Sequence, residues 1–261
     1  RGRLNRAMSF GTLGNAAIPD RLSCEYAPSG RAACKACGAM IAQDTVRIGE
    51  KVRSPWHDGF DTKWMHCRCA LNKGKSVLDF KHFQRLKWAD QLDLAAKLHP
   101  GVPPAPADEA ARLKRINDLL WEIKPHLSVP KKALIELIEL NGIYVSDKAP
   151  PASLLHTVAD GLVCGRLPKC PWCDSDALEA EGNLVQCYGY VNSATRCTYK
   201  ACGGPLFGSS PCEARLPDDF GRVGTWALTP AVERTLKNYA IPPDAPVHKL
   251  GRGGSGGVAG G

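Results

Sequence analysis

The sequence lacks three features that define common protein classes. No window of eighteen uncharged apolar residues occurs among its 261 residues, so neither a transmembrane helix nor a membrane partner is expected. The first twenty residues are basic but contain no continuous apolar core, which argues against a secretory signal. No glycine-rich phosphate-binding loop or convincing pair of catalytic carboxylates is found, so we expect no catalytic domain in this chain. The chain begins with Arg instead of Met, and we expect a fragment or a processed form.

Cysteine, in contrast, is abundant. Twelve cysteines could form a disulfide framework in a secreted protein. Their spacing argues for a different role, because eight Cys and His residues fall into two sets of four that are typical of metal-binding knuckles. We therefore predict two structural Zn²⁺ ions instead of disulfides.

The first set has the pattern C-x2-C-x28-H-x2-C and consists of Cys34, Cys37, His66 and Cys69. Two residues between ligands allow one tight turn to direct both side chains at one ion. Four protein ligands complete the tetrahedron that Zn²⁺ prefers and leave no open position, so the site should be structural. Cys67 is an alternative ligand, but it neighbours His66 and points away from it in an extended chain, which favours Cys69.

The 28 residues between the two halves of this site combine strand-forming and basic residues. Residues 21–100 carry 14 Lys and Arg against 8 Asp and Glu, whereas residues 112–200 carry 11 against 10. This local excess suggests a polyanionic partner, with ordinary solvated surface as the alternative. Cations can pair with phosphates, and rings can stack on an exposed DNA base, unless the aromatic residues merely cover the zinc core. The candidates are Arg47, Lys51, Arg53, Trp56, His57 and Phe60.

The second set has the pattern C-x2-C-x13-C-x9-C and consists of Cys170, Cys173, Cys187 and Cys197. This spacing is similar to that of zinc ribbons, and four thiolates again indicate a structural ion. Cys202 is the alternative to Cys197. We expect Cys164, Cys202 and Cys212 to be reduced thiols.

The distribution of residues along the chain predicts an α+β protein. A small, β-rich, zinc-stabilised finger with a C-terminal helix should precede an α-helical subdomain joined to a zinc ribbon. Apolar residues recur at helical spacing between residues 113 and 162, and Asn141-Gly142 suits the end of a helix. The predicted segments are a flexible basic arm (1–20), the finger (21–98), a Pro-rich linker (99–107), the helical subdomain (108–163), the ribbon (164–235) and a disordered Gly-rich tail (236–261).

The stretches SGRAACKACGAMIAQDTVRIG, VRSPWHDGF, KWMHCRC and DFKHFQRLKWADQ together resemble the poly(ADP-ribose) polymerase-type zinc finger. The resemblance covers about 75 residues and implies recognition of DNA strand breaks. It also implies that Arg31 and Arg47 contact phosphates. The loop from Trp56 to Phe60 matches the base-stacking loop of the family, but its residues differ, so the identity of the stacking ring stays open.

The stretches LKRINDLLWEIKPHLS, VADGLVCGRLPKCPWC, LVQCYGYVNSATRC and GTWALTP resemble the helical-plus-zinc, PADR-type module that follows the finger region in poly(ADP-ribose) polymerases. The resemblance spans about residues 110–235. It implies a relay between DNA binding and the catalytic domain. The family often has Trp three residues before the last cysteine, where this chain has Ala194, and this departure puts the relay contact in doubt.

The two resemblances imply a nuclear DNA-repair protein. The chain would be the sensing part of an NAD-dependent poly(ADP-ribose) polymerase (ADP-ribosyltransferase). Its partners would be nicked or broken DNA and a C-terminal catalytic domain outside this chain. Only that catalytic domain would bind NAD+. Two alternatives stay open: the targeting region of a DNA ligase or an end-processing phosphatase, and a stand-alone DNA-binding or scaffold protein.

Overall fold

The computed structural model describes residues 21–74, 76–124, 131–145, 149–209, 212–216, 220–228 and 247–249. The chain divides into two compact units. Unit 1 comprises Arg1–Lys75 and Asp79–Phe83, and unit 2 comprises Ser76–Leu78 and Gln84–Gly261. The predicted basic arm lies outside the described residues, as does the predicted tail apart from residues 247–249.

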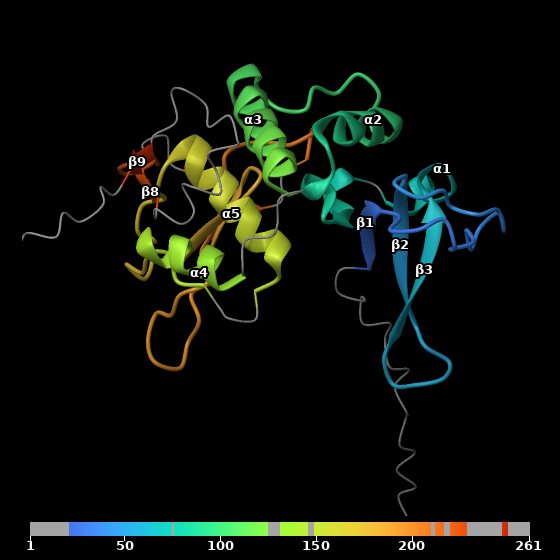
Figure 1. Ribbon diagram of the computed structural model, residues 1–261, viewed down its shortest axis with the longest axis horizontal. Helices are drawn as coiled ribbons and strands as arrows, with labels where there is room; N and C mark the ends of the chain where they lie inside the picture. Colours follow the sequence, from blue (N-terminus) through green and yellow to red (C-terminus); the bar gives the residue numbers. More distant parts are fainter. Residues whose placement is uncertain are drawn as a thin grey trace, which may run out of the picture. The chain divides into compact units, whose positions relative to one another are not determined.

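Unit 1 is built on a four-stranded sheet with the order β3-β2-β1-β4 (Figure 1). β2 pairs antiparallel with β1 and β3, and β4 pairs parallel with β1. The strands are β1 (Leu22–Tyr26), β2 (Val46–Arg53), β3 (Phe60–His66) and β4 (Phe80–Lys81). β3 continues directly into the short helix α1 (Cys67–Ala70). Three 3₁₀ turns follow along the chain, η1 (Leu71–Lys73), η2 (Val77–Asp79) and η3 (Phe83–Arg85).

The sheet of unit 1 is held by a small apolar core and by one close packing contact. The core includes Leu22, Cys24, Ile48, Met65 and Phe80. Gly49 lies opposite Trp64 in the β2–β3 register. A Cβ at Gly49 would lie 2.7 Å from the Trp64 ring, so this ring can pack on β2 only because residue 49 is glycine.

The described residues of unit 2 include four helices, α2 (Trp88–Leu98), α3 (Ala107–Ile123), α4 (Lys131–Leu140) and α5 (Pro151–Cys164). Three of them, α3, α4 and α5, contribute to one apolar core. Pro151 begins α5, where its missing N–H costs nothing. α4 ends before Asn141-Gly142, as the sequence indicates, and Gly142 has a φ of 78°. Pro130, a residue type favoured in the first turn of a helix, lies outside the described residues.

The remainder of unit 2 is β-rich. β5 (Leu178–Glu181), β6 (Leu184–Cys187) and β7 (Lys200–Cys202) form an antiparallel sheet in that order. β8 (Trp226–Leu228) pairs parallel with β9 (Val247–Lys249), which falls within the predicted tail. Trp226 and Leu228 pack into the core of the helices. The α+β architecture that the sequence predicts is therefore confirmed.

One expectation about the cysteines is wrong. Cys202 and Cys212, expected as reduced thiols, are joined in a disulfide with their Cα atoms 6.2 Å apart. The backbone brings them together, because the N–H of Cys202 donates to the Ala214 carbonyl and the N–H of Leu216 donates to the Cys202 carbonyl. Cys164 is a free thiol, as expected. None of the helices in the described parts of the chain combines the length and apolar character needed to cross a bilayer.

Candidate metal centres and nucleic-acid interface

The structure brings together the four ligands proposed for the first metal site. The ligand atoms of Cys34, Cys37, His66 and Cys69 all lie within 4.8 Å of one another. The first two stand on a tight turn in which the Gly38 N–H donates to the Cys34 carbonyl. His66 ends β3 and Cys69 lies in α1, so the site joins the turn to the end of the hairpin.

His66 is oriented by a hydrogen bond that the spacing of the ligands does not reveal. Its Nε2 lies 3.0 Å from the Met40 carbonyl oxygen, to which its N–H donates a hydrogen bond. Its Nδ1 lies 3.4 Å from Cys37 Sγ and 3.9 Å from Cys69 Sγ. This arrangement fixes the tautomer and leaves Nδ1 as the atom that can bind a metal ion.

Cys34 is prepared as a thiolate by the backbone around it. Burial alone would raise its pKa, but hydrogen bonds from the backbone of His66, Cys37 and Ala36 lower the pKa to about 6. The His66 N–H, for example, lies 3.3 Å from Cys34 Sγ. Since thiolates bind Zn²⁺, this environment suits a zinc ligand.

The second site gathers Cys170, Cys173, Cys187 and Cys197, whose sulfurs also lie within 4.8 Å of one another. Their environments differ. A hydrogen bond from the Ser175 hydroxyl, 3.1 Å away, is the main reason that the pKa of Cys173 falls to about 7. Burial raises the pKa of Cys170 to about 12. Cys202, the alternative to Cys197, is engaged in the disulfide and does not belong to this cluster.

The donor sets of both clusters fit Zn²⁺. One offers three sulfurs and one imidazole nitrogen, and the other offers four sulfurs, which are the combinations found in structural zinc sites. In the second cluster, backbone N–H groups of Gly189 and Tyr199 also point at sulfurs of Cys187 and Cys197. Because all four ligands in each cluster belong to the protein, neither site leaves a position for substrate.

The cations proposed for DNA contact have different surroundings. Arg47 is buried, donates to the Glu25 carboxylate, and lies with its guanidinium 3.8 Å from the centre of the Trp64 ring. Arg31 and Arg53 are exposed, and Lys51 is half-buried. Lys63 on β3 is a further exposed cation, which sequence reasoning missed because no motif marks it.

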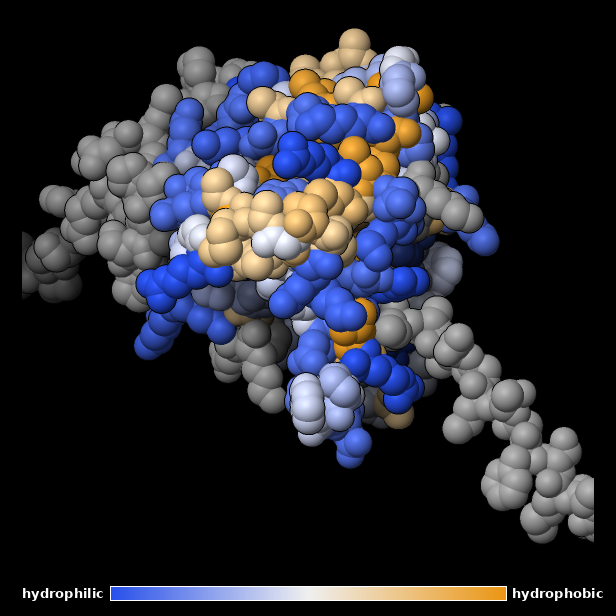
Figure 2. Space-filling view, turned by 90° about the vertical axis from the view of Figure 1, so that its right-hand side faces the viewer, coloured by the Kyte–Doolittle hydropathy of each residue, from blue (hydrophilic) through white to orange (hydrophobic). Residues whose placement is uncertain are grey.

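The three proposed rings lie at the far end of the β2–β3 hairpin. Strand pairing continues to Arg53 and Phe60, and the Ser54 N–H donates to the Gly59 carbonyl beyond them. Trp56 is 89% exposed and Phe60 is 47% exposed, so Trp56 does not cover the zinc core. This end of the hairpin projects from unit 1, and most of its surface is hydrophilic (Figures 1 and 2).

Two segments of the chain match known protein families. Residues 25–98 match the family described as the poly(ADP-ribose) polymerase and DNA-ligase Zn-finger region, and residues 106–165 match the PADR1 N-terminal helical domain. The chain thus carries a Zn-finger region of the kind shared by poly(ADP-ribose) polymerases and DNA ligases, followed by a PADR1-type helical domain.

Relatives with this family name match different lengths of the chain. Poly [ADP-ribose] polymerase 1 of Oryza sativa subsp. japonica is 26% identical over 90% of this chain and 28% of the relative. Poly [ADP-ribose] polymerase 1 of Gallus gallus is 39% identical over 30% of this chain and 8% of the relative. The Drosophila melanogaster poly [ADP-ribose] polymerase is 40% identical over 27% of this chain and 7% of the relative. The chain thus spans less than a third of the length of each of these relatives.

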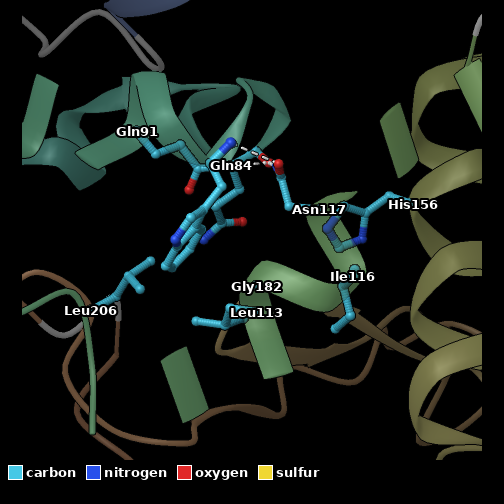
Figure 3. Close-up of a pocket in the computed structure, with 9 residues that line it drawn as sticks. Gln84, Gln91, Leu113, Ile116, Asn117, His156, Gly182 and Leu206 are labelled. Carbon is cyan, nitrogen blue, oxygen red and sulfur yellow. Dashed lines mark hydrogen bonds between the residues drawn. The ribbon is translucent and has the colours of Figure 1, made fainter. Parts of the chain in front are cut away.

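Asn117, the first residue of the sequence Asn-Asp-Leu-Leu-Trp in α3, connects two helices of unit 2. Its Oδ1 accepts the Trp88 N–H at 2.8 Å, and its Nδ2 donates to the carbonyls of Leu86 at 2.7 Å and Gln84 at 3.3 Å. Gln91 donates to the same two carbonyls. These polar groups border a cavity of about 20 Å³, which has room for about one water molecule (Figure 3).

Trp121, the last residue of the same stretch, lies among cations. The Nζ atoms of Lys124 and Lys87 are 4.0 and 5.2 Å from the centre of its ring. Burial lowers the pKa of Lys124, and the neighbouring charges of Lys87 and Arg85 lower it further. Ala194, which departs from the family pattern, is exposed, and its N–H donates to Asn192 Oδ1 at 3.0 Å.

Proposed function

We propose that this protein binds DNA strand breaks through the far end of the β2–β3 hairpin, with two zinc ions in structural roles. The observation that carries the proposal is the exposed Trp56 ring at the end of a hairpin that carries exposed cations. Cations such as Arg53 and Lys63 pair with phosphates, and an exposed ring can stack on a base. A closed duplex hides its base faces, whereas a nick or an end exposes one.

The first metal site supports this role because it anchors the base of the same hairpin. His66 is the last residue of β3, and the Lys35 N–H on the metal-binding turn donates to the Trp64 carbonyl. Zinc binding contributes about 10 to 16 kcal/mol to the folding of small zinc-dependent peptides. We infer that zinc fixes the hairpin and takes no part in chemistry.

The wider role rests on the relatives. We propose that the chain is the sensing part of an NAD-dependent poly(ADP-ribose) polymerase that acts in the nucleus in DNA repair, and that NAD+ binds a catalytic domain outside this chain. Arg31, which is exposed, is proposed as a phosphate contact. The matching finger family also includes DNA ligases, but the match to the PADR1 helical domain favours a polymerase.

The experiment compares binding to nicked and covalently closed circles of the same DNA at several salt concentrations. We expect tighter binding to the nicked circle and an affinity that falls steeply as salt rises. Cys37→Ser should unfold unit 1 and abolish binding. Equal affinity of the zinc-loaded protein for the two circles would contradict the proposal.

A further inference from the structure

The disulfide between Cys202 and Cys212 encloses a short segment of unit 2, residues 203–209, which we call the strap. Cys202 ends β7 and is 1% exposed, whereas Cys212 is half-buried. The two cysteines are ten residues apart in the sequence. Because the bond ties both ends of the enclosed segment to β7, it limits the conformations that are open to the strap.

The strap fastens α2 and the segment after it to the β-rich part of unit 2. Phe207 is 2% exposed, its N–H donates to the Pro104 carbonyl at 2.7 Å, and its ring centre lies 6.3 Å from that of Trp88 on α2. Leu206 is 1% exposed and lines the same small cavity as Gln91 of α2 (Figure 3). One short segment therefore holds a helix that lies far away in the sequence.

The strap holds this position in a conformation that side chains disfavour. Phe207 has a φ of 48°, in the left-handed region that glycine adopts freely. Gly208 follows with a φ of 77°, and Leu206 and Ser209 exchange two backbone hydrogen bonds across the turn. A residue such as Phe207 keeps a left-handed conformation only while the surrounding structure holds it. The disulfide is a covalent part of that surrounding structure, and a thiol can break it.

Reduction of the disulfide proceeds in two balanced steps. The thiolate of a small thiol such as glutathione attacks Sγ of Cys212, the more accessible cysteine. The S–S bond breaks, and its electron pair leaves on Sγ of Cys202, which takes up a proton. A second thiolate attacks the glutathione sulfur of the mixed disulfide, so that Cys212 also leaves as a thiolate and is protonated. Two small thiols thereby become one disulfide, and the protein gains two electrons and two protons.

We propose that Cys202 and Cys212 form a redox switch that controls how firmly the strap holds α2. In the oxidised state the strap packs Phe207 against Trp88, and in the reduced state the strap leaves α2, so that this helix opens more often. α2 lies within the residues that match the finger family, so the switch acts on the end of that match.

The inference rests on the proposed function in one respect, the nuclear location. Disulfides are rare where glutathione keeps thiols reduced, and those that form in such compartments are usually transient or redox-sensing. A disulfide that only stabilised the fold would resist glutathione, whereas a switch must respond to it.

The first part of the test places the zinc-loaded protein in buffers with different ratios of reduced to oxidised glutathione. Mass spectrometry after alkylation gives the fraction of Cys202 that is paired with Cys212, and hydrogen exchange measures the opening of α2 in the same samples. The disulfide should open within this range of ratios. The amides of α2, that of Trp88 included, should then exchange about tenfold faster or more, because a cross-link over ten residues restricts the unlinked chain by about a hundredfold.

Two results would overturn the switch. One is a disulfide that persists in reduced glutathione alone, and the other is unchanged exchange of α2 after the disulfide has opened. The amides of α4 should keep their protection in every buffer. An equal loss of protection in α4 would mean that unit 2 unfolds as a whole and would contradict a local switch.

Variants separate the switch from a general effect of the buffer. Cys202→Ala combined with Cys212→Ala should give fast exchange of α2 at every ratio, and Phe207→Ala should give it with the disulfide intact. Slow exchange in the double variant would refute the proposal. Cys164→Ser is the matched control, because it removes a free thiol from α5 and should leave the response to glutathione unchanged. The zinc content of each sample verifies that faster exchange does not reflect loss of metal.

No readout of this test involves DNA, so its failure is distinct from failure of the proposed function. A disulfide that does not respond to glutathione refutes the switch and leaves recognition of breaks standing. Equal affinity for nicked and closed circles refutes the proposed function, while a response of α2 to glutathione would still support the switch.

Discussion

Replacing Asn117 with alanine should destabilise unit 2 far more than its single side chain suggests. Asn117 is 5% exposed, and α2 has no capping side chain of its own. The Oδ1 of Asn117 therefore caps α2 from another helix by accepting the Trp88 N–H. Its Nδ2 donates to two carbonyls, those of Leu86 and Gln84.

The magnitude follows from these three bonds. Loss of a helix N-cap costs about 0.5 to 2 kcal/mol, and each ordinary hydrogen bond contributes about 1 kcal/mol. Asn117→Ala should therefore lower the free energy of unfolding by about 2 to 4 kcal/mol. For a unit of this size, the melting temperature should fall on the order of 10 °C.

The assay is thermal unfolding of the zinc-loaded protein, with amide hydrogen exchange as a local measure. The exchange of the Trp88 N–H should accelerate specifically. The control is Asp118→Ala on the same helix, which removes a 48% exposed carboxylate paired with Lys114 and should cost about 0.5 kcal/mol or less. A loss below about 1 kcal/mol in Asn117→Ala, or unchanged protection of the Trp88 N–H, would refute the reasoning.

Three further predictions concern packing, pH and metal. Gly161→Ala should lower the melting temperature of unit 2, because the new Cβ would lie 2.1 Å from the Trp226 ring. The cost of overpacking, about 1 to 3 kcal/mol, outweighs the gain in helix propensity. A raised melting temperature would contradict this prediction. Burial alone would raise the pKa of Glu50, but hydrogen bonds and charges from Lys73 and Arg21 lower this pKa below its value in the unfolded chain. The ionised Glu50 therefore stabilises unit 1 above about pH 4. This stabilisation is lost as the pH falls through the folded-state pKa of Glu50. Glu50→Gln should thus cost about 1 to 2 kcal/mol in urea unfolding at pH 7, and an equal cost at pH 3 would show that the charge is irrelevant. Chelation should unfold unit 1 and the β-rich part of unit 2, as followed by circular dichroism, and unchanged spectra in the metal-free protein would contradict structural roles for zinc.

The sequence predicts those parts of the molecule that depend on short-range spacing. Two residues between Cys34 and Cys37 indicate the turn of the first candidate metal site, and apolar residues at helical spacing indicate α3 and α5. The sequence does not reveal contacts that depend on tertiary packing. The hydrogen bond between His66 and the Met40 carbonyl joins residues 26 positions apart, and neither residue type indicates the other.

Residues that share a motif can also have different roles. Asn117 and Trp121 both belong to the stretch that carries the resemblance, but their spacing does not show that Asn117 caps α2 or that Lys124 and Lys87 lie over the Trp121 ring. Likewise, no pattern in the sequence indicated that Cys202 and Cys212 would pair. The helix cap, the cation–ring contacts and the disulfide depend on which surfaces meet after the helices and strands have formed. A sequence indicates such tertiary contacts less clearly than it indicates the periodicity of a helix or strand.

Arg47 shows how burial changes the electrostatic interpretation of the hairpin. In the sequence it is one of several cations that surround the first metal site, and each contributes equally to a net charge. In the structure its charge is compensated by Glu25 and its face is covered by Trp64, so the field that an approaching phosphate meets comes mainly from exposed cations such as Arg53 and Lys63. A phosphate contact by Arg47 would require the Glu25 carboxylate to give up its bonds. Exposed cations can bind a phosphate without breaking an ion pair. They lie on the two strands that lead to the Trp56 loop, so the electrostatic and stacking contributions to DNA binding both arise near the far end of the hairpin.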